Sequence, residues 1–195
     1  FTMLAIPLFI FAGNLMNNTG ITSRLVKLAN VLTGHMYGSI GQVSVVLSTL
    51  MGGVSGSAVA DAAMECRILG PEMTKRGYAP GWSAAINCLS GLIVATIPPS
   101  MGLILYGTVG EVSIGRLFIA GFVPGFIMCI FMMIATSWSA RHFGYKPDHE
   151  KPSSLREIGK ACIESIWALL FPVIPIVLIR GGVMTPSESG AFAVF

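Results

Sequence analysis

Hydrophobic residues fill stretches of this sequence that are too long for the core helices of a soluble protein. Residues 1–23, 82–110 and 117–140 contain no charged side chain, and each reaches the ~20 residues that a helix needs to cross a bilayer. Residues 165–179 form a shorter stretch of the same kind, which predicts a further crossing when residues 162 and 163 are included. The pattern therefore predicts an all-α integral membrane protein that crosses the lipid bilayer several times.

The composition agrees with lipid as the main solvent. Of 195 residues, 53% are hydrophobic and 11% are charged, whereas roughly a quarter of the residues of a soluble domain are charged. The net charge of +3 is small and dispersed, so we expect no nucleic-acid partner. The cysteines have neither metal-site nor disulfide spacing, and we expect four buried thiols, at Cys66, Cys88, Cys129 and Cys162.

The positions of lysine and arginine predict how the chain is oriented in the membrane. Nine of these residues lie in three connecting regions, at residues 24–27, 75–76 and 141–160, against two in the regions 107–116 and 180–187. The positive-inside rule places the first three regions in the cytoplasm. Because the chain starts without methionine and both of its ends are apolar, we expect it to be part of a longer polypeptide.

The connecting regions and the apolar stretches together divide the chain into segments. Residues 22–33 separate an apolar face from a basic face, which predicts a helix at the cytoplasmic surface. Proline and alternating charges predict a solvated loop over residues 141–160. The predicted segments are a span with its interfacial helix (1–36), a re-entrant hairpin (37–77), a broken transmembrane helix (78–116), a transmembrane helix (117–140), a cytoplasmic loop (141–160), and a transmembrane helix with the start of another (161–195).

The hairpin prediction depends on a helix that is too short and on charges that lipid excludes. Residues 37–52 give about 24 Å of helix, which is less than a crossing. The glycine and serine cluster that follows breaks the helix, and the next arm carries the charged residues Asp61, Glu65, Arg67 and Glu72. We therefore predict a helical hairpin that enters from the cytoplasm, turns near the midplane at residues 53–57 and is buried against protein.

A second interruption lies within residues 96–102, where Pro98 and Pro99 remove two backbone donors and free carbonyl groups about one turn earlier. Irregular backbone at membrane depth lines a cavity or is covered by protein, and many secondary transporters bind carboxylates and sodium at broken helices. Four hydroxyl groups offer further oxygen ligands, those of Ser55, Ser57, Thr96 and Ser100. The alternative is that glycine and serine only allow close helix packing.

Three acidic residues, Asp61, Glu65 and Glu72, fall on one face of a continuous helix. Asp61 has two open roles: it stabilises the N-terminal end of its own helix, or it helps to fix the ion site. For Glu65 and Glu72 we predict structural pairing with a nearby basic residue, namely Arg67, Lys75 or Arg76.

At these residues the chain resembles the large membrane subunit of the tripartite ATP-independent periplasmic (TRAP) transporters, the DctM-like family. The resemblance covers essentially the whole chain. It rests on four stretches: IPLFIFAGNLM (residues 6–16), GVSGSAVADAA (53–63), IPPS (97–100) and GVMTPSE (182–188).

The resemblance implies a sodium-driven elevator transporter of the bacterial inner membrane, of which this chain holds one half of an inverted repeat. It also implies two partners, a periplasmic solute-binding protein that delivers the substrate and a small four-helix membrane subunit. The substrate would be a dicarboxylate, keto acid, sugar acid or sialic acid, and no cofactor is implied besides sodium. The binding residues would be Ser55, Gly56, Ser57, Asp61 and Pro98, Pro99 and Ser100, with Thr96 nearby; for sodium we name Ser55, Ser57 and Ser100.

Three other functions remain open at this point. One is a stand-alone sodium-coupled carboxylate carrier, and another is a membrane scaffold that transports nothing. The third is an intramembrane serine protease, because residues 53–56 match the Gly-x-Ser-Gly of rhomboid-type proteases. A catalytic dyad needs a histidine near that serine, and the histidines lie at predicted cytoplasmic edges or in the loop, at His35, His142 and His149. We therefore expect no enzyme.

Overall fold

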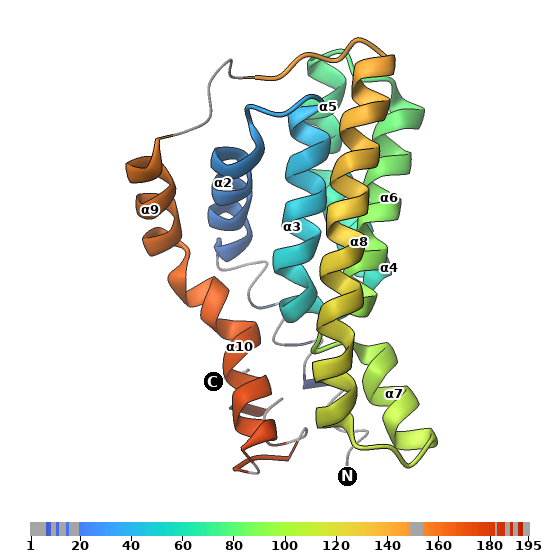
Figure 1. The fold of residues 1–195 in the computed structure, drawn as a ribbon, viewed down its shortest axis with the longest axis vertical. Helices are drawn as coiled ribbons and strands as arrows, with labels where there is room; N and C mark the ends of the chain where they lie inside the picture. The colour runs from blue at the N-terminus through green and yellow to red at the C-terminus, as the bar shows by residue number, and fades with distance from the viewer. Residues whose placement is uncertain are drawn as a thin grey trace.

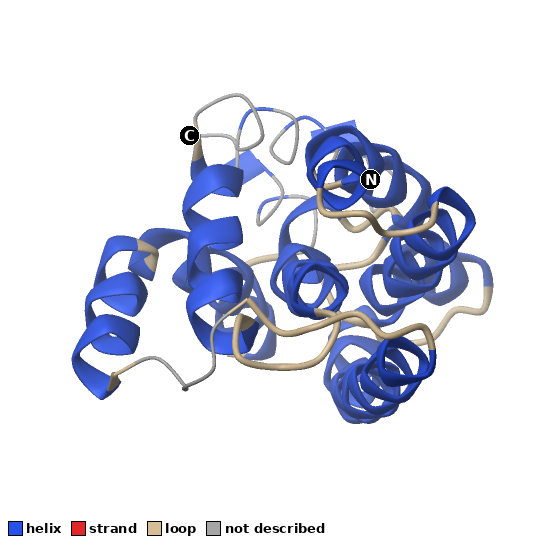
Figure 2. Ribbon diagram, turned by 90° about the horizontal axis from the view of Figure 1, so that it is seen from above, coloured by secondary structure: helices blue, strands red, loops and turns tan. Residues whose placement is uncertain are grey.

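The computed structural model describes residues 20–148, 154–181 and 183–185, together with residues 7, 8, 11, 15, 188, 191 and 192. All of the regular structure in this part of the chain is helical (Figures 1 and 2), as the hydrophobic pattern predicts. The helices are α2 (Ile21–Thr33), α3 (Ser39–Ser55), α4 (Ala58–Ile68), α5 (Gly70–Lys75), α6 (Pro80–Thr96), α7 (Met101–Val109), α8 (Ile114–His142), α9 (Leu155–Glu164) and α10 (Ile166–Arg180).

The longest helix, α8, includes the crossing predicted over residues 117–140. Its 29 residues are apolar enough to cross a membrane, and no other single helix among the described residues meets the same test of length and composition. One face carries exposed Phe126, Phe131 and Trp138. The opposite face approaches the end of α6 closely, because a Cβ atom on Gly125 would lie 2.5 Å from Cγ1 of Ile97, the residue that follows α6. This is the small-residue packing that lets membrane helices come together.

The charge-free stretch at residues 82–110 forms two helices instead of one, as the double proline predicts. α6 ends at Thr96, α7 begins at Met101, and the two axes differ by 43°. Taken together the pair is long and apolar enough for one span. Pro98 and Pro99 occupy the break because neither can donate the backbone hydrogen bond that would continue the helix.

Two helices of opposite direction, α3 and α4, form a helical hairpin where one is predicted; its re-entry into the membrane stays a prediction. α3 continues to Ser55, and only Gly56 and Ser57 separate it from α4, so the turn is shorter than the predicted 53–57. In Figure 1 this turn lies well short of the end of the molecule at which α7 meets α8. Both arms pack against α6, where a Cβ atom on Gly91 would lie 3.0 Å from the carbonyl oxygen of Ala58.

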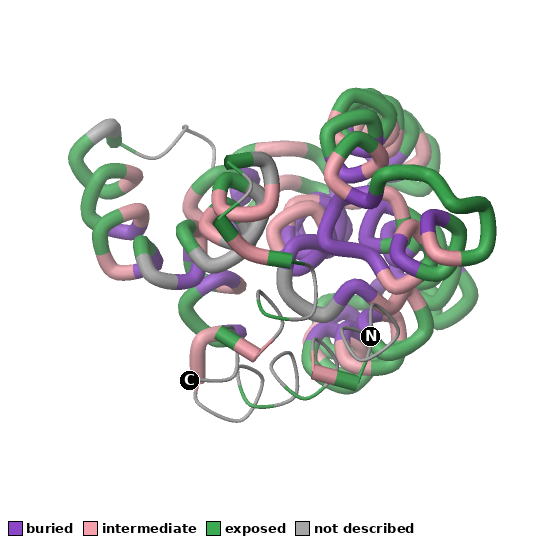
Figure 3. Tube along the Cα trace, turned by 90° about the horizontal axis from the view of Figure 1, so that it is seen from below, coloured by how far each residue is buried: buried purple, intermediate pink, exposed green. Residues whose placement is uncertain are grey.

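The core lies around α3, and Figure 3 shows the buried positions gathered inside the group of helices. Leu25 and Ala29 of α2 pack there against Val43 and Leu47 of α3. The predicted apolar face of α2 is therefore real, but protein covers it. Whether α2 also lies along a membrane surface stays a prediction.

Two of the regions predicted to be cytoplasmic, 75–76 and 141–160, meet at one end of the bundle, beside the turn that follows α2. The backbone amide of Asp148 donates to the carbonyl oxygen of Gly34 at 3.0 Å, and Arg76 donates to the Asp148 carboxylate. Beside them, the guanidinium carbon of Arg141 lies 4.5 Å from the centre of the Tyr37 ring. This grouping agrees with the orientation that the lysine and arginine positions predict.

Two sequence-based predictions about the periphery are wrong. The predicted loop over residues 141–160 already contains helix α9 from Leu155 onward, because Ser154 and Glu157 form a capping box that starts it. Of the four cysteines only Cys129 is buried, whereas Cys66 and Cys88 lie on exposed faces of α4 and α6 and Cys162 is half-buried.

The two ends of the chain are described only in part. Most of the span predicted over residues 1–23 lies outside the described residues, as do Pro186 and Ser187. The backbone amide of Thr185 donates to the Glu188 carboxylate at 2.7 Å, as in the capping box at the start of a helix. α10 has 15 residues, fewer than a full crossing needs, so a crossing at this place stays a prediction.

Candidate functional site: the hairpin tip and the broken helix

The tip of the α3–α4 hairpin contacts the break between α6 and α7. The carbonyl oxygen of Gly56 accepts a hydrogen bond from the amide of Met101 at 3.2 Å. A Cβ atom on Gly56 would lie 2.7 Å from the carbonyl oxygen of Pro99, and the φ of Gly56 is +59°. Glycine is required here twice, by the left-handed backbone and by the close approach of another backbone.

Four helix ends converge at this contact. α3 ends at Ser55 and α6 ends at Thr96, while α4 and α7 begin next to Ser57 and Ser100. Ser57 caps α4 by accepting from the amide of Ala60 at 3.4 Å. The two N-terminal ends carry partial positive charge, and the two C-terminal ends carry partial negative charge. The junction therefore offers complementary poles to an anion and to a cation.

Ser100 satisfies one of the carbonyl groups that the prolines free. Pro99 has no amide hydrogen for the carbonyl oxygen of Ala95, and the Ser100 hydroxyl donates to that oxygen at 2.7 Å. Ser100 is fully buried. Thr96 points elsewhere, since its hydroxyl donates to Leu92 in its own helix and approaches the sulfur of Met128 on α8. The structure thus brings Gly56, Pro99 and Ser100 together but leaves the Thr96 hydroxyl outside.

Two carboxyl groups, those of Asp61 and Glu65, are buried inside the hairpin. Asp61 is 1% exposed and Glu65 is 0% exposed. Ser48 of α3 lies 2.9 Å from Oδ2 of Asp61 and 2.6 Å from Oε1 of Glu65. Ser44 of α3 and Ser90 of α6 both donate to Oε2 of Glu65.

The predicted pairing of Glu65 with a basic residue is therefore wrong, because its partners are three serine hydroxyls. The pairing predicted for Glu72 is confirmed with Arg76, whose Nε lies 3.0 Å from the Glu72 carboxylate. The predicted acidic face does not persist, since α4 ends at Ile68 before Glu72 is reached. Asp61 lies one turn inside α4, and its place in an ion site stays a prediction.

Sequence reasoning missed the three serines, although part of the signal was present. Ser44 and Ser48 stand four residues apart in a mainly apolar helix, which places both hydroxyls on one face. A pair of this kind predicts a buried polar partner, because an apolar environment leaves hydroxyls in need of one. The partner itself could not be read from the sequence, since Ser90 is 46 residues from Ser44.

The histidine needed for a serine protease is not near the tip in the described part of the chain. His35 belongs to the turn before α3, and His142 ends α8, whose Ala140 approaches Gly38 at that same end of α3. Ser55 ends α3 at the other end, about 24 Å away by helical rise. His149 lies outside the described residues.

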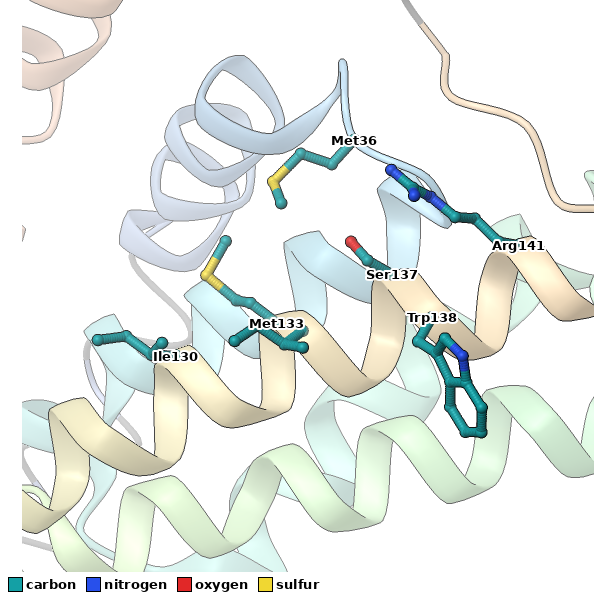
Figure 4. Close-up of a pocket in the computed structure, with 7 residues that line it drawn as sticks. Met36, Ile130, Met133, Ser137, Trp138 and Arg141 are labelled. Carbon is teal, nitrogen blue, oxygen red and sulfur yellow. The ribbon is translucent and has the colours of Figure 1, made fainter.

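An open apolar groove of about 410 Å³ lies away from the tip (Figure 4). Met36, Met133, Trp138 and Arg141 line it, where the turn before α3 meets α8. Its lining belongs to the Arg141 end of the bundle, so it is not part of the junction at Gly56.

The comparison with protein families decides what this arrangement belongs to. The family model described as "Tripartite ATP-independent periplasmic transporter, DctM component" matches residues 1–195. The chain belongs to this family. Its TRAP transporter relatives are membrane permeases, which agrees with the apolar helices of the structure and with the expectation that the chain is no enzyme.

Several curated TRAP permeases are similar over nearly the whole chain. The 2,3-diketo-L-gulonate TRAP transporter large permease protein YiaN of Escherichia coli is 39% identical over 195 residues, which are 100% of this chain and 45% of that protein. The sialic acid TRAP transporter large permease protein SiaM of Vibrio cholerae is 39% identical over 98% of this chain and 44% of its own length. The C4-dicarboxylate TRAP transporter large permease protein DctM of Rhodobacter capsulatus is 33% identical over 99% of this chain and 47% of its own length. The chain thus spans about half the length of these relatives.

Proposed function

We propose that this chain supplies about half of the large membrane subunit of a sodium-coupled secondary transporter, which imports a small organic acid across the bacterial inner membrane. The observation that carries the proposal is the junction of the hairpin tip with the broken helix, at the hydrogen bond between Gly56 and Met101. It supports the proposal because the junction occurs in a chain of the DctM family.

The junction provides a pole for each of the two solutes. The N-terminal ends of α4 and α7 attract a carboxylate, as helix N-termini do for anions. Backbone oxygens at the ends of α3 and α6, with the hydroxyls of Ser55, Ser57 and Ser100, suit sodium, which prefers oxygen ligands. Family membership does not identify which organic acid is transported. The three relatives above are named for 2,3-diketo-L-gulonate, sialic acid and C4-dicarboxylates, all of which carry carboxylates.

The proposal includes how the chain moves and what it works with. The hairpin re-enters the membrane from the cytoplasm and, with α6 and α7, forms the moving part of an elevator transporter. The hydrogen bond at Met101 and the contact of Gly91 with Ala58 would hold hairpin and broken helix as one body. A periplasmic binding protein delivers the substrate, and a small four-helix subunit completes the membrane complex.

Uptake by the complete permease in proteoliposomes tests this function. Labelled C4-dicarboxylates, sugar acids and sialic acid are offered with and without a sodium gradient, the small subunit and a candidate binding protein. The proposal predicts uptake only when all three are present. Uptake that needs sodium but no binding protein would instead identify a stand-alone carrier, and a folded complex without any uptake would favour a scaffold.

A further inference from the structure

The open groove between α8 and the turn before α3 combines an apolar length with a basic end. Ile130, Met133 and Ser137 follow one another along one side of α8, and Arg141 lies one turn beyond them (Figure 4). Met36 forms the facing wall. The groove has a volume of about 410 Å³, which lies within the range of about 300–1,000 Å³ for ligand pockets. Its lining therefore suits a ligand that is apolar along most of its length and polar at one end.

The length of the groove matches the hydrocarbon of one membrane leaflet. Ile130 and Arg141 both belong to α8, and their separation in the sequence corresponds to about 16 Å of helical rise. Half of a hydrocarbon core that is ~30 Å thick measures about 15 Å. Ile130, Ile134 and Trp138 are each more than half exposed, so this side of α8 is open along the groove. A single acyl chain aligned with α8 would extend from the Arg141 end to Ile130.

Arg141 provides an unpaired positive charge at the end of the groove. Its guanidinium carbon lies 4.5 Å from the centre of the Tyr37 ring. Such stacking holds the planar group in place and leaves its N–H groups able to donate in that plane. No carboxylate among the described residues pairs with Arg141, and Asp148, the acidic residue nearest to it in the sequence, accepts from Arg76. The donors of Arg141 are therefore available to an anion.

Ser137 offers a second donor one turn deeper in the groove. The buried side chain of Gln42 donates through Nε2 to the Ser137 oxygen at 2.9 Å. The hydrogen of the Ser137 hydroxyl has no acceptor in the part of the chain that the structure describes. Three polar side chains line the groove, those of Ser137, Trp138 and Arg141, and all three can donate. The ligand should therefore carry acceptors, with its negative charge nearest to Arg141.

A glycerophospholipid carries such groups in the same order. Its phosphate accepts charge-assisted hydrogen bonds of the kind that arginine makes, its ester carbonyls are acceptors that follow the phosphate, and its acyl chains are apolar. Trp138 agrees with this placement because tryptophan is enriched where a membrane meets water. The lysine and arginine positions place this end of the bundle in the cytoplasm, and the cytoplasmic leaflet carries a negative surface potential from anionic lipids.

We propose that the groove is a binding site for an anionic phospholipid of the cytoplasmic leaflet. Its phosphate binds Arg141, an ester carbonyl accepts from Ser137, and one acyl chain lies between Met36 and Met133. The bound lipid thus contacts both α8 and the turn before α3. The proposal depends on α8 crossing the membrane, and it does not depend on the sodium and substrate junction at Gly56.

Native mass spectrometry of the complete permease, purified with its small subunit and depleted of lipid, tests the role of the charge. Phosphatidylglycerol and phosphatidylcholine with the same acyl chains are added in equal amounts. We expect one phosphatidylglycerol to bind more tightly than phosphatidylcholine, and Arg141→Gln to weaken its binding roughly 5-fold. Lys75→Gln, which removes an exposed charge near the same end of the bundle, should leave this binding unchanged. Equal binding of the two lipids, or equal effects of the two variants, would overturn the proposal.

A photoreactive phosphatidylglycerol tests the position of the acyl chain in the wild-type permease. With the reactive group near the end of the chain, we expect attachment to α8 around Ile130. Met133→Trp, which fills the groove, should reduce this attachment. Ala135→Trp, at an exposed position of α8 outside the groove, should not. Attachment that survives Met133→Trp would indicate general contact with membrane lipid, and no attachment to α8 would indicate that another protein segment covers the groove. Either result would overturn the proposal.

Discussion

The backbone carbonyl oxygen of Gly56 accepts a hydrogen bond from the amide of Met101, so the tip of the hairpin is joined to the first residue of α7. The two residues are 45 positions apart in the sequence, and each stands where a helix is interrupted. Because these interruptions meet, the ends of α3 and α6 lie next to the starts of α4 and α7. The candidate site depends on this contact.

Replacing Gly56 with alanine should disrupt this junction. The added Cβ atom would lie 2.7 Å from the Pro99 carbonyl oxygen, and the left-handed backbone costs a non-glycine residue roughly 1–2 kcal/mol. We expect sodium-dependent uptake by the complete permease to fall on the order of 10-fold, since 1.4 kcal/mol corresponds to that factor. Gly81→Ala is the control, because nothing lies within 4 Å of its Cβ position. Equal uptake by the two variants would argue against the junction.

Ser100→Ala should destabilise the broken helix. The substitution leaves the carbonyl oxygen of Ala95 without its buried donor, which costs about 1–3 kcal/mol. A lower unfolding temperature of the purified permease would show this. Thr108→Ala is the comparison, because the Thr108 hydroxyl bonds a carbonyl of its own helix without replacing a missing amide. If Ser100→Ala lowers the unfolding temperature no more than Thr108→Ala does, the Ala95 carbonyl has another donor.

Gly121→Ala should separate α8 from the break. Its Cβ atom would lie 2.6 Å from the carbonyl oxygen of Thr96, a backbone atom that cannot rotate away, and overpacking of this kind costs typically about 1–3 kcal/mol. We expect less folded permease after heating. Gly102→Ala in α7 provides the control, since its nearest neighbour would be the Ser100 oxygen at 3.7 Å. A heat-stable Gly121→Ala permease would mean that α8 does not approach the break this closely.

Glu65→Ala should destabilise the protein far more than Glu72→Ala. The first change removes a buried carboxyl group that contacts three serine hydroxyls and leaves a cavity, with an expected cost on the order of 3 kcal/mol. The second removes a partly exposed ion pair with Arg76, worth about 0–1 kcal/mol. Denaturation of both variants in the same detergent measures the difference. Similar losses would contradict the burial of Glu65 among these hydroxyls.

The features that the sequence predicts correctly are those with a local cause. Pro98 and Pro99 interrupt α6 wherever the helix lies, and Gly56 permits a turn that other residues resist. The length and apolar composition of α8 likewise predict a span without knowledge of its neighbours. The start of α9 was equally local, since Ser154 and Glu157 form a recognisable capping box, and it was missed because prolines and charges in the same stretch suggested a loop.

The features that the sequence does not predict depend on distant contacts. Basic residues near Glu65 in the sequence suggested an ion pair, and only packing against α3 and α6 shows that hydroxyls surround it. Thr96 and Ser100 both flank the prolines, yet their hydroxyls point to different carbonyl groups because α8 lies on one side of the break. No local pattern specifies that Gly56 meets Met101, because 45 positions separate the two residues.

The most direct test of the sodium site at the hairpin tip is whether sodium protects that tip. Val59 is 81% exposed in the first turn of α4, and Ile68 ends the same helix, about 13 Å farther along. In a cysteine-free complete permease, Val59→Cys and Ile68→Cys are treated with a small thiol reagent in sodium or in choline. We predict that sodium slows modification of Val59→Cys several-fold and leaves Ile68→Cys unchanged. Equal modification of Val59→Cys in the two salts would contradict a sodium site at the tip.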